Sequence, residues 1–102
     1  MEDFLAACAE LRPKVLAETG CLAYDHTIPI HWPPHPAQAN AANRVVLIEA
    51  WDGEESLRRH GTVPHGKDFA ARVRPLRESV RVEVLRRGAL SGQITGTAAS
   101  SE

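Results

Sequence analysis

The fold of this chain is decided by the stretch RVVLIEAWDGEESLRRHGTVPHGKDF, residues 44–69. Its first residues alternate between two faces, a period typical of a β-strand, and both faces are mostly apolar. One face carries Val45, Leu47, Glu49 and Trp51, and the other carries Val46, Ile48 and Ala50. A strand of this kind is expected to be covered on both sides.

A short helix is predicted directly after this strand. Asp52 is a typical helix N-cap, and Glu55 stands where it would close a capping box. Gly61 would supply the left-handed residue that ends the helix. We therefore expect a helix over about residues 53–60, with His60 in its last turn.

The remaining elements follow from the same kind of periodicity. Before the central stretch, an apolar stripe predicts an amphipathic helix that ends before Gly20, and alternation predicts a strand over residues 21–28. After it, a second helix and a strand over residues 79–85 are expected. The stripe of the first helix consists of Phe4, Cys8, Leu11 and Val15, with Leu22, Tyr24, His26 and Ile28 on one face of the following strand.

Residues 29–43 contain four prolines and no periodic pattern. They connect two strands that should pair as a hairpin, and such a long connection is typical of a lid or a binding loop. The side chains of His31, Trp32 and His35 could close over a pocket from this loop. The alternative is a stiff, exposed excursion.

Composition limits the class of protein. A chain of 102 residues with 43% hydrophobic and 25% charged residues predicts one soluble globular domain. A net charge of -1 gives no field that would attract nucleic acid, and no apolar run has the length of a membrane span. With no signal peptide pattern and two isolated cysteines, Cys8 and Cys21, we expect a cytoplasmic protein with reduced thiols.

Two motifs carry a resemblance to a known family. The first is E-x-W, then a histidine nine residues after the tryptophan and a second histidine five residues later. This frame holds Glu49, Trp51, His60, His65, Lys67 and Phe69. The second motif is E-T-G-C-L-A-Y at residues 18–24. With the E-T-G-C-L-A-Y motif before the E-x-W motif, as in the family, roughly residues 4–85 resemble the antibiotic biosynthesis monooxygenase domain family.

The resemblance implies a fold and a range of functions. Members are α+β, ferredoxin-like proteins that form dimeric α+β barrels, and they include cofactor-independent quinol and anthrone monooxygenases. It therefore implies a homodimer, a small aromatic substrate and no cofactor, with neither nucleic acid nor membrane as partner. Because the family is functionally mixed, a non-catalytic small-molecule-binding barrel and a haem-degrading relative remain alternatives, as does an isomerase acting on a hydroxy-ketone.

Oxygenation of a quinol without flavin or metal requires a base, because the phenolate can pass an electron to dioxygen. The site needs a group that titrates near neutral pH, an apolar cavity and exclusion of water. The candidate catalytic residues are His60 and Glu49, with Glu49 or Asp25 orienting the imidazole of His60. The resemblance implies His60 and Trp51 as pocket residues. The candidate substrate contacts are Trp51, His65, Tyr24 and Trp32.

Each candidate also has a purely structural interpretation. A histidine in the last turn of a helix is stabilised by the helix dipole by about 0.3–1 kcal/mol. A tryptophan at a strand end is often part of the core. A mostly buried carboxylate such as Glu49 must be paired, and Arg44 or Arg72 could serve as its partner.

The chain departs from the family at its beginning. Members start with an apolar strand in the middle of the sheet, whereas this chain starts at the helix. A truncated start, a strand from a partner, or residues 93–97 folding back could explain the gap, since unpaired central backbone groups would each cost about 1–3 kcal/mol. We expect a single domain over residues 1–87 and a polar tail over residues 88–102, either mobile or swapped into a sheet.

Overall fold

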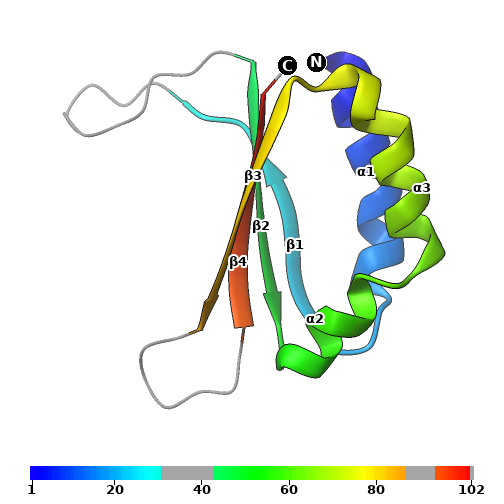
Figure 1. Ribbon diagram of the computed structural model, residues 1–102, viewed down its shortest axis with the longest axis vertical. Coiled ribbons are helices and arrows are strands. Elements are labelled where there is room, and N and C mark those ends of the chain that lie inside the picture. The colour runs from blue at the N-terminus through cyan, green and yellow to red at the C-terminus, as the bar shows by residue number, and fades with distance from the viewer. Residues whose placement is uncertain (31–42, 87–93, 102) are drawn as a thin grey trace, which may run out of the picture.

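The computed structural model describes residues 1–30, 43–86 and 94–101. Four strands form one antiparallel sheet in the order β1-β2-β4-β3, and the helices lie together on one side of it (Figure 1). The predicted α+β, ferredoxin-like arrangement is confirmed. The elements are α1 (Glu2–Leu16), β1 (Cys21–Thr27), β2 (Arg44–Trp51), α2 (Glu54–His60), α3 (Pro64–Val73), a 3-10 turn (Arg74–Leu76), β3 (Ser79–Arg86) and β4 (Ile94–Ser101).

The vacant central position of the sheet is occupied by β4. This strand pairs with β2 on one side and with β3 on the other, antiparallel to both. Gly96 lies opposite Glu49 on β2 and Val84 on β3. A Cβ at Gly96 would come within 2.8 Å of the Glu83 carbonyl oxygen, so glycine allows the two backbones to approach. The C-terminal segment therefore satisfies the backbone groups that a central slot would leave unpaired.

The core lies between the helices α1 and α3 on one side and the strands β1 and β2 on the other. The predicted apolar stripe of α1 is confirmed as buried, and Pro13 lies inside this helix without ending it. Two clusters fill the layer. One contains Phe4, Ala7, Cys8, Val45 and Val73, and the other contains Leu11, Val15, Tyr24 and Trp51.

The predicted ends of α2 are wrong in detail. The N-cap residue is Gly53, no side-chain capping bond forms, and the Asp52 carboxylate instead accepts a hydrogen bond from Ser56 Oγ. Gly61 has φ -65°, which is right-handed. The left-handed glycine is Gly20, with φ 86°, where a Cβ would collide with the Ser56 side chain. The turn between α1 and β1 thus packs tightly against α2.

A β-bulge between Cys21 and Ala23 changes the faces of β1. Cys21 lies opposite Trp51 and Tyr24 lies opposite Glu49, and both residues pack on the core side of the sheet. Leu22 is 51% exposed, so its predicted place beside Tyr24 is wrong. A one-residue insertion reverses the alternation on one side of the bulge, which period-2 reasoning cannot anticipate.

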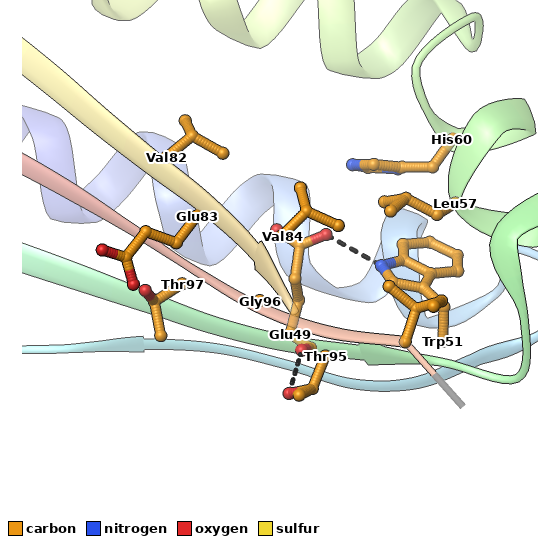
Figure 2. A pocket seen from close by; sticks show the side chains of 11 residues that line it. Glu49, Trp51, Leu57, His60, Val82, Glu83, Val84, Thr95, Gly96 and Thr97 are labelled. Atoms are coloured by element: carbon orange, nitrogen blue, oxygen red, sulfur yellow. Dashed lines mark hydrogen bonds between the residues drawn. The ribbon is translucent and has the colours of Figure 1, made fainter. Parts of the chain in front are cut away.

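Half of the sheet lies beyond the helices. Every residue of β3 is exposed, including Val82 and Val84, which stand on the same side of the sheet as α2 (Figure 2). This leaves an open apolar surface next to the end of α2. Within the described residues, no helix is long and apolar enough to cross a membrane.

Candidate functional site

A pocket of about 190 Å³ lies where the end of α2 faces the open half of the sheet (Figure 2). Its walls are mostly apolar and come from four elements, while three ionisable residues from β2, α2 and β3 also line it. The apolar walls include Leu57, Val82, Val84 and Ile94, and the ionisable residues are Glu49, His60 and Glu83. Such a cavity suits a small apolar ring with one or two polar substituents.

His60 is the last residue of α2, and its imidazole extends over the sheet above Trp51 (Figure 2). The ring centroids of His60 and Trp51 are 4.7 Å apart with an interplanar angle of 34°, and the Tyr24 ring meets His60 edge-on at 5.7 Å. Nδ1 of His60 lies 3.1 and 3.0 Å from the two carboxylate oxygens of Glu18. The ring is therefore held on several sides, and its Nε2 has no hydrogen-bond partner among the described residues.

Glu18 is the site residue that the sequence reasoning missed. Glu49 and Asp25 were the expected orienting groups for His60, but the carboxylate at hydrogen-bond distance is that of Glu18. Its Oε2 also lies 2.7 Å from Nε2 of His65. The signal was present, because Glu18 is the first residue of the E-T-G-C-L-A-Y motif.

Glu49 occupies a different part of the site. Its Oε1 accepts a hydrogen bond of 2.8 Å from Trp51 Nε1, and its second oxygen has no partner among the described residues. This bond gives the half-buried carboxylate one donor, which comes from Trp51 and not from the arginines considered above. Asp25 pairs instead with Arg12 at 3.0 Å.

Trp51 and Tyr24 both pack against the imidazole ring of His60. Trp51 lies in the pocket wall, but it is 0% exposed and packs under His60 and Leu57. Tyr24 is buried, and this burial, with the nearby Glu49 carboxylate second, raises the pKa of its phenol. Tyr24 therefore stays neutral at physiological pH and supports His60 from outside the pocket lining.

The other expected substrate contacts are not brought to this pocket. His65 lies at the start of α3 and lines a separate, more polar pocket of about 100 Å³ between α1 and α3. Trp32 and the tip of the proline-rich loop lie outside the described residues. The structure thus brings together Glu49, Trp51 and His60, with Tyr24 behind them.

Nucleophilic catalysis by Cys8 and a metal site are not supported by the described residues. Burial raises the pKa of the Cys8 thiol to about 11, so this cysteine is a poor nucleophile at neutral pH. Among the described residues, no group of three or more metal-ligating side chains is arranged to hold a metal ion.

Comparison with family models gives one match that covers most of the chain. Residues 1–72 match the family described as "Antibiotic biosynthesis monooxygenase". The matched region contains Glu18, Glu49, Trp51, His60 and His65, whereas β3 and β4, which supply the valine wall of the pocket, lie beyond it. Comparisons with curated proteins and with solved structures gave no match.

Proposed function

The chain belongs to the antibiotic biosynthesis monooxygenase family, and we propose that it is a cofactor-independent monooxygenase that oxidises a quinol-type aromatic. Family membership indicates a monooxygenase-like or small-molecule-binding function. The observation that carries the finer proposal concerns the imidazole of His60, which lines a pocket with apolar walls. Its Nε2 has no hydrogen-bond partner among residues 1–30, 43–86 and 94–101, and its Nδ1 faces the Glu18 carboxylate. This is the arrangement that a general base requires.

In the proposed reaction, Nε2 of His60 accepts a phenolic proton from the substrate. The resulting electron-rich phenolate passes an electron to dioxygen, and the two radicals combine at a ring carbon. One oxygen atom stays in the product and the other leaves as water, so that quinol and dioxygen give hydroxyquinone and water. The apolar walls limit contact between the intermediate and water on the sides formed by α2 and the sheet.

The size of the pocket favours a substrate with one ring. Its volume of about 190 Å³ is only slightly larger than the roughly 150 Å³ cavity that holds benzene in an engineered protein core. We therefore propose a monocyclic quinol as substrate rather than a three-ring anthrone. A haem macrocycle, which is larger than either, is not favoured for the same reason.

Oxygen uptake with matched substrates tests this proposal. Substituted hydroquinones are expected to give faster enzyme-dependent uptake than anthrones at equal concentration, and labelled dioxygen is expected to place one heavy atom in the product. Uptake equal to the uncatalysed rate for every substrate would exclude the monooxygenase. Binding of a hydroquinone without uptake would then assign the chain to the non-catalytic binding barrels.

We further propose that the protein is a homodimer, joined through the sheet face opposite the helices. Ile48 on β2 and Leu85 on β3 are 45% and 46% exposed on that face. A sheet covered by helices on one side is expected to bury its other apolar side against a second layer. Sedimentation analysis is expected to give the dimer mass, and Ile48→Lys is expected to give the monomer. A monomeric wild type at micromolar concentration would contradict the proposal.

A further inference from the structure

The carboxylate of Glu18 faces Nδ1 of His60 at 3.0 Å, on the opposite side of the ring from the nitrogen that accepts the substrate proton. We propose that Glu18 is the positioning residue that fixes the proton of His60 on Nδ1, and that His65 holds the Glu18 carboxylate in place. The effect on catalysis rests on the proposed function. The assignment of the proton rests on the contacts alone.

The contacts determine which imidazole nitrogens carry hydrogen. An ionised carboxylate only accepts hydrogen bonds, so each nitrogen facing Glu18 must be a donor. Nδ1 of His60 lies 3.0 Å from Oε2, and Nε2 of His65 lies 2.7 Å from the same oxygen. Neutral His60 therefore carries its proton on Nδ1, which leaves the lone pair of Nε2 available to the pocket.

The backbone places Glu18 between the two histidines. It lies in the turn after α1, where its amide bonds to the Val15 carbonyl at 2.9 Å and its carbonyl accepts from the Cys21 amide at 3.2 Å. The turn is joined to the end of β2 by a 2.9 Å bond from the Asp52 amide to the Gly20 carbonyl. The side chain of Glu18 is only 11% exposed, so its carboxylate interacts with His60 with little screening by solvent.

Other ionisable groups near His60 do not make this contact. The carboxylate of Glu49 accepts from Trp51, the phenol of Tyr24 stays neutral, and the thiol of Cys21 bonds the Ala23 carbonyl. When His60 takes the substrate proton, Glu18 is therefore the carboxylate in direct hydrogen-bond contact with the new imidazolium, while the charge of Glu49 lies in the same pocket without such a contact. A carboxylate that orients a histidine and stabilises its charged form is a known device for making imidazole an effective base.

His65 contributes from outside the pocket. It stands at the start of α3, is absent from the pocket lining, and reaches the site only through Glu18. Its hydrogen bond restrains one carboxylate oxygen, which limits rotation of the Glu18 side chain. Loss of this bond should loosen Glu18 without removing its charge.

Nitrogen-15 NMR of the imidazoles tests the assignment, because the chemical shifts distinguish the two neutral tautomers. In the wild type, His60 is expected to be protonated on Nδ1. Glu18→Gln keeps the shape of the side chain but removes the charge, and it is expected to give a mixture of tautomers. The same variant is expected to lower kcat by less than the roughly 10²–10⁴-fold that a positioned base contributes, with little change in KM, since Glu18 does not line the pocket.

Asp25→Asn is the matched control, because this half-exposed carboxylate pairs with Arg12 and not with a histidine. It is expected to change neither the tautomer nor kcat, and His65→Ala is expected to lower kcat less than Glu18→Gln does. His60 protonated on Nε2 in the wild type, or on Nδ1 alone in Glu18→Gln, would overturn the assignment. The expected tautomers without any oxygen uptake would instead overturn the proposed function and leave the assignment standing.

Discussion

Replacement of His60 with alanine is expected to lower kcat for quinol-dependent oxygen uptake by about 10²–10⁴-fold, the range that a positioned general base contributes. The substitution removes the nitrogen that accepts the phenolic proton, and no other described side chain offers an unpartnered nitrogen to the pocket. The fold should survive, because His60 ends a short helix and its side chain is 17% exposed. Uptake at saturating hydroquinone measures the effect, and circular dichroism checks the fold.

The matched control is His26→Ala. His26 also lies on the helix side of the sheet, but it contacts Tyr24 and Phe69 and lines another pocket beside α1. Burial lowers the pKa of His26, so it is neutral at the pH of the assay. This variant is expected to retain kcat. A His60→Ala protein with the wild-type kcat would exclude His60 as the base and direct attention to Glu49, a carboxylate in the same pocket.

The parts of the site that lie within one local pattern could be predicted from sequence. The alternation of β2 places Glu49 and Trp51 on one face, and the following helix carries His60 back over that face. These relations depend only on the periods of strand and helix. The spacing of the E-x-W motif and its histidine was therefore enough to bring the three residues together.

The contact between Glu18 and His60 could not be predicted in this way. The two residues are 42 positions apart, and their meeting depends on the bulge in β1 and on the tight packing of Gly20 against α2. Neither feature has a periodic signature. The expected partners, Glu49 and Asp25, lie on β2 and β1, whereas the observed partner lies in the turn after α1.

The place of β4 could be predicted only as one of several alternatives, in which residues 93–97 fold back into the gap. Its sequence, ITGTAASS, has one large apolar residue and resembles a tail in composition. A central strand, however, gains backbone hydrogen bonds along both edges, and these do not depend on side-chain type. The small side chains of Thr95, Gly96 and Thr97 also leave room beneath His60 and the β3 valines. The composition that makes this segment hard to recognise as a strand therefore helps to form the pocket.

Replacement of Trp51 with alanine is expected to lower the free energy of unfolding by about 3–5 kcal/mol, the usual cost of removing a large buried aromatic side chain. Trp51 is 0% exposed and packs with Leu11, Val15 and Tyr24. Its loss would leave a cavity beneath His60 and remove the indole N–H that donates to the Glu49 carboxylate at 2.8 Å. Urea denaturation followed by circular dichroism measures the change.

Trp51→Phe separates packing from hydrogen bonding. Phenylalanine keeps an aromatic ring under His60 but cannot donate to Glu49, so its cost is expected to be smaller, about 1–3 kcal/mol for the unsatisfied carboxylate together with the lost volume. Because a domain of this size has a total stability of only about 5–15 kcal/mol, the alanine variant should show a large shift of its midpoint. A loss below about 1 kcal/mol on Trp51→Ala would mean that the core does not depend on this ring. In that case Trp51 could not restrain the imidazole of His60, because a ring that is not fixed by the core cannot fix the ring packed against it.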